Sequence, residues 1–582
     1  MPAGPRRGVC WLRPAPRRAP ASRWPAAAVG RLVAGLALVA SVALPAARSQ
    51  PSASLQPQPS PDPAVASVLA TVQAAPMVPR GAPLAARLQA VYRENRGRLL
   101  WAEGYRPGAA VPLLHAVLAA ASRHGLDPAE YRSEWIAGEL AAWRDGRIDG
   151  PQAIARLDVT MTLALLRYLS DLRDGRAAQR QISGTWQPAP ALSSEAMLAA
   201  AARDADALRR LLDRAAPGYP DYHRLLQARS RLEAMVVAGR EPPRFPPGTT
   251  LRAGDRSPLV AALAARLAEL GDLAASASTP DVYEDEVVEA VRRFQRRHGL
   301  ADDGVAGPAT LAAVQVPNRA RLRQVDLALE RLRWLPPITA DRVIAINIPD
   351  FRLWAYDRTD DGRVRAVLES NVVVGRQGRT PTPVFIAQLN AVDFNPYWNV
   401  PYSIARGETV PRLRRDPAYL EREGMEFVAA DGTVSRQVTA ANLDAVAQGR
   451  MRIRQRPGPR NALGKVKLTM PNTMNIYLHD TPSRGLFAQT RRDFSHGCIR
   501  VEKVVELATF ALSRQAGWDA RSIDAALQGS DLRVARVAPA IPVVVFYTTA
   551  VAGEDGMIRF LPDLYGFDRK LDAVMPPSVV GG

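Results

Sequence analysis

The stretch that most constrains this chain is the hexapeptide Ser495-His496-Gly497-Cys498-Ile499-Arg500. It contains the only cysteine beyond the first ten residues, and a glycine and a histidine precede that cysteine directly. A second histidine, His479, follows the apolar run 475–478. A cysteine and a histidine supply a nucleophile and a general acid/base when the fold brings them together. We therefore predict that Cys498 is a nucleophile and that His479 is its proton-transfer partner.

The surroundings of Cys498 in the sequence suggest how its thiol is activated. A thiol attacks a carbonyl as thiolate, so the nucleophile needs a lowered pKa. Apolar residues recur at helical spacing in 502–512, which predicts that Cys498 lies just before a positively polarised helix N-terminus. His496 or His479 can supply an imidazolium as a second influence. Because Gly497 permits a sharp turn, the amides of Gly497 and Cys498 are expected to face one oxyanion.

Two other interpretations of the same residues stay open. A lone cysteine is often a small buried hydrophobe and a lone histidine a satisfied core residue. Alternatively, His479, His496 and Cys498 are all good zinc ligands. No nearby CxxC or HxxxH pairing supports the zinc site. The pairing of a tight glycine turn with a thiol and a histidine favours catalysis.

Tyr477-Leu478-His479-Asp480, followed by the hexapeptide, resembles the signature of the L,D-transpeptidases, cysteine enzymes that remodel bacterial peptidoglycan. Other segments resemble the large, periplasmic YcbB-like branch of that family, and together the match covers about residues 320 to 570. Many smaller members of the family have Asn at the position of Arg500, whereas the YcbB-like branch has Arg there, as this chain does. The further matching segments are Leu329–Pro336, Asn347–Pro349, Val373–Gly375, Thr380–Pro383, Asn395–Trp398 and Phe546–Ala550.

The resemblance implies a multidomain α+β protein. A helical scaffold and a small three-helix peptidoglycan-binding module are joined to a β-rich YkuD-like catalytic domain with an inserted helical lid. The implied reaction forms 3-3 cross-links between peptidoglycan stems through a cysteine thioester and releases D-alanine. The alternatives are an L,D-carboxypeptidase or wall-protein ligase with the same site, or a non-catalytic peptidoglycan-binding scaffold. No cofactor or metal is implied.

The resemblance also implies roles for the residues around the nucleophile. The backbone carbonyl of Asp480 orients His479, and the Gly497 amide helps to hold the oxyanion. His496 is expected to shape the turn beside the nucleophile, and a role as base is the weaker alternative. The expected substrate-binding residues are Arg500, Tyr477, Trp398, Ser495 and His496.

The N-terminus has the composition of a targeting segment. Residues 1–48 carry eight arginines and no acidic residue, and they contain the apolar run Leu32–Leu44. Its length fits a signal peptide better than a spanning helix of roughly 20 residues. We predict a periplasmic protein, and an uncleaved membrane anchor remains an alternative. Residues 49–84 are rich in Pro, Ser and Gln, which predicts a flexible linker.

The remaining 498 positions of this 582-residue chain are too many for one core. Helical spacing predicts two helical regions, at 85–245 and at 247–316. The resemblance implies that the first is a scaffold domain and the second a peptidoglycan-binding-like module. Alternating apolar residues after Pro336 predict a sandwich-like β domain at 340–550, with a charged helical insertion at 402–460 and a C-terminal extension at 551–582. An insertion ahead of the predicted catalytic residues is a candidate lid.

The formal net charge of +19 raises the question of nucleic-acid binding. Eight of those positive charges lie in the targeting segment, and the sequence has no nucleic-acid fold signature. A positive surface also suits an anionic polymer. The resemblance implies peptidoglycan stem peptides and glycan as partners, and no nucleic acid is expected.

Overall fold

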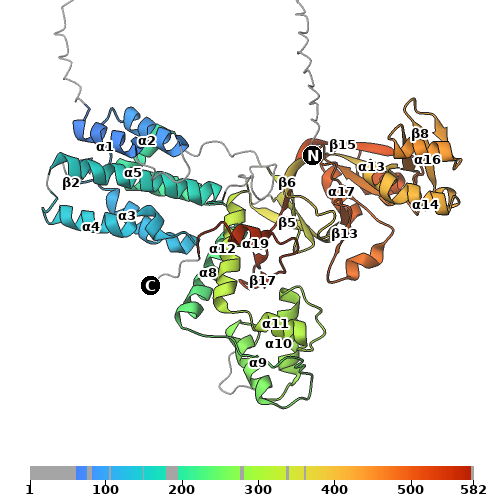
Figure 1. Ribbon diagram of the computed structural model, residues 1–582, viewed down its shortest axis with the longest axis horizontal. Coiled ribbons are helices and arrows are strands. Elements are labelled where there is room, and N and C mark those ends of the chain that lie inside the picture. The colour runs from blue at the N-terminus through green and yellow to red at the C-terminus, as the bar shows by residue number, and fades with distance from the viewer. Residues whose placement is uncertain are drawn as a thin grey trace, which may run out of the picture. The chain divides into compact units, whose positions relative to one another are not determined.

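The computed structural model describes residues 61–74, 82–103, 106–148, 150–177, 194–274, 281–335, 340–359 and 362–577 (Figure 1). The predicted targeting segment, residues 1–48, lies outside the described residues, as does much of the predicted linker. Within the described part of the chain, no helix is both long and apolar enough to span a membrane.

The predicted flexible linker is wrong for its described part, because residues Pro63–Ala74 form helix α1. The Asp62 carboxylate accepts a hydrogen bond from the Ala64 amide at 2.8 Å, and Pro63 occupies the first helical position. A capping carboxylate and a proline at the first turn both favour helix initiation. Ala64 and Val65 are buried in the core of the helical region, so this segment is folded against it.

The helical region that follows has one hydrophobic core, shared by α1 to α7. Its longest helix, α5, contains the buried Asp158, which accepts hydrogen bonds from the Tyr92 hydroxyl at 2.5 Å and the Trp101 amide at 2.7 Å. These bonds join α2 and the chain after it to α5. The elements are α2 (Ala82–Glu94), β1 (Ala102–Glu103), β2 (Arg106–Pro107), α3 (Val111–Ala119), η1 (Ala121–His124), η2 (Pro128–Tyr131), α4 (Ser133–Arg144), α5 (Pro151–Asp174), α6 (Glu195–Arg203) and α7 (Ala205–Ala215).

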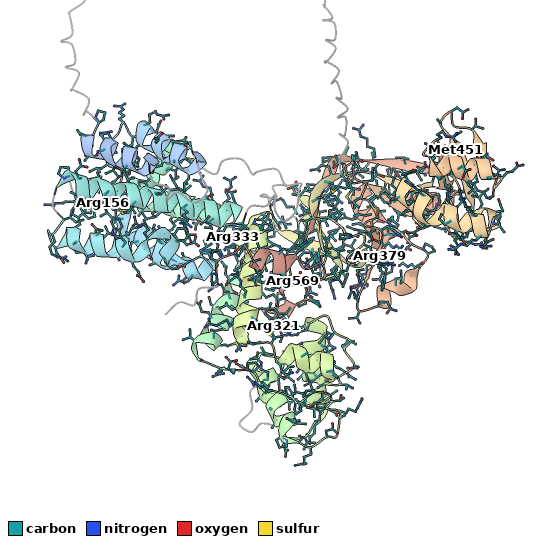
Figure 2. The ribbon with its side chains drawn as sticks, viewed as in Figure 1. Arg156, Arg321, Arg333, Arg379, Met451 and Arg569 are labelled. Carbon is teal, nitrogen blue, oxygen red and sulfur yellow. The ribbon has the colours of Figure 1, made fainter. Side chains whose placement is uncertain are left out.

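A second core is built from segments far apart in sequence. Helix α8 (Pro220–Val237) packs on α12 (Asn318–Arg333), and strands β16 (Ala550–Ala552) and β17 (Ile558–Phe560) complete the cluster. Buried polar side chains accompany this apolar contact: Arg333, labelled in Figure 2, pairs with Glu330 at 3.2 Å and with the Tyr222 hydroxyl. Buried charges need such partners, because desolvation otherwise disfavours them.

The small module predicted at 247–316 has its own core. It consists of α9 (Pro258–Glu269), α10 (Asp285–Arg297) and α11 (Pro308–Val314). The Gln295 side chain holds the turn between α10 and α11, since its amide donates to Val305 O at 3.0 Å and its carbonyl accepts from Gly304 N at 2.9 Å. A buried glutamine therefore fixes the turn that contains Asp303 and Gly304.

The β-rich region forms one nine-stranded sheet with the order β13-β5-β14-β12-β11-β6-β15-β3-β4. Its strands are β3 (Arg342–Asn347), β4 (Arg352–Arg358), β5 (Val364–Gly375), β6 (Phe385–Phe394), β11 (Val466–Thr469), β12 (Leu478–His479), β13 (Asp493–Ser495), β14 (Ile499–Val501) and β15 (Arg533–Phe546). Two helices, α17 (Val504–Leu512) and α18 (Ala520–Gln528), contribute residues to its core. Residues 484–488 form the 3-10 helix η5 (Arg484–Ala488).

This sheet closes on itself, which differs from the predicted sandwich. The first part of β5 pairs with β4 from Val364 to Asn371, and the last part pairs with β14 and β13. Because β5 is twelve residues long, it pairs with β4 along its first part and with β14 and β13 along its last part, and this double pairing joins the two ends of the strand order. The closed sheet shares one apolar core with helices α17 and α18.

The insertion predicted at 402–460 contains helices and also strands β8, β9 and β10. Together with β7, directly ahead of the insertion, they form a four-stranded antiparallel sheet, β7-β10-β8-β9, around a separate apolar core. The elements are β7 (Trp398–Asn399), α13 (Tyr402–Ile404), the π-helical turn η4 (Ala405–Thr409), α14 (Val410–Arg415), α15 (Tyr419–Arg422), β8 (Met425–Ala429), β9 (Val434–Ser435), α16 (Ala440–Ala447) and β10 (Met451–Gln455). We call residues 402–460 the insert.

The segment predicted as a C-terminal extension packs against the rest of the chain through β16, β17 and α19 (Phe567–Asp572). The Tyr565 hydroxyl donates to Gly375 O at 2.6 Å, at the end of β5. The Tyr547 hydroxyl donates to Asp563 at 2.6 Å. The C-terminal segment therefore braces the end of β5, close to the chain that carries the hexapeptide.

Candidate active site

The backbone brings the two predicted catalytic residues onto neighbouring strands. Strands β12 and β14 are parallel, with Leu478 opposite Ile499 and His479 opposite Arg500. Leu478 and Ile499 are fully buried in the core. Side chains alternate between the two faces of a strand, so the residues on either side of this pair point to the other face. That face carries Tyr477, His479, Cys498 and Arg500.

The turn before the cysteine is held by hydroxyl groups. The Ser495 hydroxyl donates to Cys498 O at 2.5 Å and accepts from Gly497 N at 3.1 Å. The Thr382 hydroxyl donates to Gly497 O at 2.8 Å. Gly497 has φ +110°, a backbone conformation that side-chain-bearing residues rarely adopt. The turn is rigid, and the Gly497 amide, expected to face an oxyanion, is engaged by Ser495 in this structure because the hydroxyl folds back over the turn.

The Cys498 thiol is free, partly buried, and lies 3.6 Å from Asn475 O. Burial raises its pKa above the usual value; the Tyr477 amide and hydroxyl, then Lys467 and Arg500, act in the opposite direction but do not outweigh it. The prediction of a thiolate stabilised before a helix N-terminus is therefore wrong. Strand β14 follows Cys498, and α17 begins only at Val504. Burial thus favours the neutral thiol over the thiolate at this site.

The His479 imidazole is buried and neutral. Its Nδ1 lies 2.5 Å from Asp480 O. A carbonyl only accepts, so Nδ1 carries the proton and Nε2 is the basic nitrogen. Burial lowers the pKa of His479 to about 3, with further lowering by the cations Arg500 and Lys467, while the Asp480 carbonyl raises it. An imidazolium partner for the thiol is thus not present at rest.

The contact between His479 and the Asp480 backbone is the one expected from the sequence resemblance. The Asp480 carboxylate is occupied elsewhere, because Oδ2 accepts from the Lys465 amide at 2.9 Å and Oδ1 pairs with Arg484 at 3.3 Å. Only the backbone of Asp480 therefore serves the imidazole.

Tyr477 contacts the thiol, and Trp398 contacts Tyr477. The Tyr477 ring lies 5.6 Å from the His479 ring in an edge-to-face arrangement. Burial raises the pKa of the Tyr477 hydroxyl most, the Cys498 group adds to this through charge and a hydrogen bond, and a hydrogen bond with Trp398 opposes it. Trp398 belongs to β7, which pairs with β10 of the insert. Tyr477 and Trp398 thus connect the cysteine to the sheet of the insert.

Arg500 and His496 have different surroundings. Within the described residues, the buried Nε of Arg500 has no hydrogen-bond partner. Burial lowers the pKa of this guanidinium, and the Cys498 group raises it. His496 is exposed, and its Nε2 lies 2.8 Å from Glu408 in η4 of the insert. His496 therefore joins the turn to the insert, and Arg500 places a cation on the face of the thiol.

Sequence reasoning missed two residues of this face. Lys467 lies opposite His479 on β11, and Asp393 lies opposite Lys467 on β6. Their ion pair measures 3.2 Å. The alternation of side chains along a strand could have revealed Lys467, since it is a polar residue between the apolar Val466 and Leu468 and so is expected on the face opposite to theirs. As for the zinc alternative, no group of three or more metal-binding side chains occurs among the residues that the structure describes.

Family models match three parts of the chain. Residues 341–537 match the L,D-transpeptidase catalytic domain, residues 86–228 a scaffold domain, and residues 256–314 a "Putative peptidoglycan binding domain". A Haemophilus influenzae protein described as a "Putative L,D-transpeptidase" is 36% identical over 253 residues, which are 43% of this chain and 49% of that protein. This chain thus spans about half the length of that relative.

Two solved structures are also similar to part of the chain. The L,D-transpeptidase (residues 123–326) of Xylanimonas cellulosilytica is 18% identical, with a TM-score of 0.15, and the alignment covers 52% of this chain and 100% of that one. The L,D-transpeptidase of Stackebrandtia nassauensis is 14% identical, with a TM-score of 0.20, covering 52% and 97%. Scores this low add nothing to the assignment. The family models and the curated relative agree with the site: residues 341–537 of this chain match the L,D-transpeptidase catalytic domain.

Proposed function

We propose that the protein is a cysteine acyltransferase that forms 3-3 cross-links in peptidoglycan. Cys498 attacks the carbonyl between the third residue and the terminal D-alanine of a tetrapeptide stem. D-Alanine leaves and a thioester forms. The side-chain amine of a second stem then attacks the thioester and regenerates the thiol. The observation that carries the proposal is the shared sheet face of His479, in β12, and Cys498, directly before the paired strand β14.

Both groups are neutral before the reaction, so the proton must move as the bond forms. The basic Nε2 of His479 takes the proton of the Cys498 thiol during attack and gives it to the departing amine. It then takes a proton from the incoming amine and returns one to sulfur. The Asp480 carbonyl keeps Nδ1 protonated throughout, which maintains the tautomer that this shuttle needs.

The remaining residues on this face have supporting roles. The Cys498 amide stabilises the oxyanion, joined by the Gly497 amide once that group leaves Ser495. Tyr477 and Trp398 form walls of the donor site. Arg500 contacts a substrate carbonyl or carboxylate through its planar guanidinium. Ser495 and His496 shape the turn, and the link from His496 to Glu408 makes the insert a candidate lid over the bound stem.

The other parts of the chain fit delivery of this chemistry to the wall. The module at 256–314 is proposed to bind peptidoglycan glycan or stems. The arginine-rich, apolar N-terminus is proposed to export the protein to the periplasm, with or without retention as an anchor. Fractionation of cells expressing the full chain or a chain lacking residues 1–48 tests export, and only the full chain should reach the periplasm.

A product assay tests the proposed reaction. Purified enzyme is incubated with disaccharide tetrapeptides, and mass spectrometry should detect cross-linked dimers together with free D-alanine. Tripeptide alone would assign an L,D-carboxypeptidase instead. Unchanged substrate, with the sacculus still bound by the protein, would assign a non-catalytic scaffold. A Cys498→Ala variant is the control, because it lacks the nucleophile and leaves the fold intact.

A further inference from the structure

A row of polar side chains extends from His479 across the open face of the sheet. Lys467 is opposite His479, and Asp393 is opposite Lys467. Their neighbours Leu468, Leu478 and Val392 are buried in the core on the other face. Directly opposed residues on adjacent strands lie about 4.5 to 5.5 Å apart at Cβ. Lys467 is therefore a direct neighbour of the proposed acid/base residue.

The ammonium of Lys467 is held in place. It donates to Asp393 Oδ2 at 3.2 Å, and the Thr469 hydroxyl donates to the same oxygen at 3.0 Å, which fixes the carboxylate. It also lies 5.1 Å from the centre of the Tyr477 ring. An ammonium has three N–H donors, and Asp393 accepts from one of them. With 23% of its side chain exposed, Lys467 retains donors that a ligand can reach.

The charge on this face favours an anion. Asp393 offsets the charge of Lys467, but Arg500 adds a second cation, and in the described part of the chain no hydrogen-bond partner is found for its buried Nε. The Tyr477 side chain connects the two ends of the face, because its ring meets the Lys467 ammonium and its hydroxyl meets the Cys498 group. An anion bound by Lys467 would thus lie about one side chain from the reacting sulfur.

We propose that Lys467, positioned by Asp393, is a specificity-determining residue that binds the terminal carboxylate of the donor stem. The inference rests on the proposed function, in which the scissile carbonyl is followed by a single residue. One residue spans about 3.5 Å of extended chain, so the terminal carboxylate lies close to the carbonyl under attack. A stem that continues beyond this residue has no carboxylate at that place. The enzyme should consequently select tetrapeptide donors over longer or amidated ones.

The test uses acylation by the donor alone, which excludes any carboxylate of an acceptor stem. Two tetrapeptide donors are compared, one with a free terminal carboxylate and one with a terminal amide. Release of the terminal residue and the mass of the acylated enzyme give kcat/KM for each. The variants are Lys467→Met and Lys467→Arg. Lys465→Met is the matched control, since it removes the same charge directly ahead of the same strand, and the Lys465 ammonium binds Leu527 O at 3.0 Å.

Wild-type enzyme should prefer the carboxylate donor by about 10- to 100-fold, the usual contribution of a hydrogen bond to a charged group. Lys467→Met should abolish this preference by slowing the carboxylate donor more than the amide donor. Lys467→Arg should restore part of the preference, and Lys465→Met should keep it. A general folding defect slows both donors equally and leaves the ratio unchanged.

Two results would overturn the inference while leaving the proposed function intact: a wild-type enzyme that uses both donors equally, or a Lys467→Met variant that keeps the wild-type ratio. Failure of the wild-type enzyme to release the terminal residue from either donor would refute the proposed function, and this inference with it.

Discussion

Two histidines in different regions of this molecule have the same electrostatic character. Burial lowers the pKa of His479 in the catalytic domain to about 3, and it lowers the pKa of His124 in the helical region to about 3 as well, with Arg333 as the next cause. His124 Nδ1 lies 3.0 Å from the Tyr222 hydroxyl, which also binds Arg333. His479 instead shares a sheet face with Cys498, the one thiol that the structure describes. A shifted pKa indicates burial, and the neighbouring nucleophile distinguishes the candidate catalytic group.

The largest expected effect comes from the thiol itself. Cys498→Ala should reduce cross-linking and D-alanine release by about 10⁴-fold or more, because no other described group can form the thioester. Cys498 is only partly buried, so the variant should unfold near the wild-type temperature. Product analysis by mass spectrometry and thermal unfolding check the two expectations. Full activity in this variant would show that Cys498 is not the nucleophile, and His479 would then no longer differ from His124 by its neighbouring thiol.

The two histidines should respond in opposite ways to substitution by glutamine. His479→Gln should lower kcat by about 10²- to 10⁴-fold, the usual contribution of a positioned acid/base group. His124→Gln should leave kcat within about twofold and lower the free energy of unfolding by about 1 to 3 kcal/mol, because it disturbs a buried hydrogen bond. Steady-state kinetics and urea unfolding of both variants provide the measurements. Equal losses of kcat would contradict the comparison.

Both histidines should also make the protein less stable in acid. Their folded pKa of about 3 lies below the value of about 6.5 in an unfolded chain. Between these values the unfolded chain binds protons that the folded chain does not, so stability falls as pH drops from 6.5 toward 3. Each histidine should account for about 2 kcal/mol at pH 5. Urea unfolding at pH 5 and pH 7 should show a smaller loss in His124→Gln, and an unchanged loss would be evidence against a buried neutral His124.

The pH dependence of alkylation tests whether the Cys498 thiol is neutral in the resting enzyme. Burial raises the pKa of Cys498, so its alkylation by iodoacetamide should keep accelerating up to and beyond about pH 8.5, the usual thiol pKa. A thiolate–imidazolium pair would instead give a plateau at neutral pH. Alkylation rates measured between pH 6 and pH 10 distinguish these curves. A neutral plateau that disappears in His479→Gln would contradict a neutral thiol.

The smallest effect is expected at the link between the catalytic turn and the insert. His496 and Glu408 are 42% and 60% exposed as side chains, and exposed ion pairs contribute about 0 to 1 kcal/mol. Glu408→Gln should therefore change kcat/KM by less than about fivefold. The exposed Glu421→Gln in the insert is a matched control. A loss as large as that of His479→Gln would mean that the His496–Glu408 pair matters to turnover as much as His479, which would contradict its supporting role.

The sequence alone predicted the parts of this architecture that depend on local pattern. The alternation of Val343 to Ile348, the helical spacing of Val504 to Leu512 and the match around Cys498 all correspond to observed elements or to the family assignment. Alternation and helical spacing report which face of an element is buried, and that information is local.

The features that sequence reasoning missed depend on contacts between distant segments. The raised pKa of Cys498 follows from how deeply the assembled site buries the thiol, which no short motif encodes. The Asp393–Lys467 pair depends on the register of β6 and β11, separated by the whole insert. The position of Cys498 ahead of a strand rather than a helix depends on a three-residue element, β14, too short to show a period.

The most direct test of the central claim is the mass of the intact enzyme during turnover. After brief incubation with a tetrapeptide donor and no acceptor, the account predicts a mass increase equal to the donor minus one alanine, located on Cys498 by peptide mapping. The increase should be absent from Cys498→Ala. Release of D-alanine with no adduct on Cys498, continuing in the Cys498→Ala variant, would contradict the account.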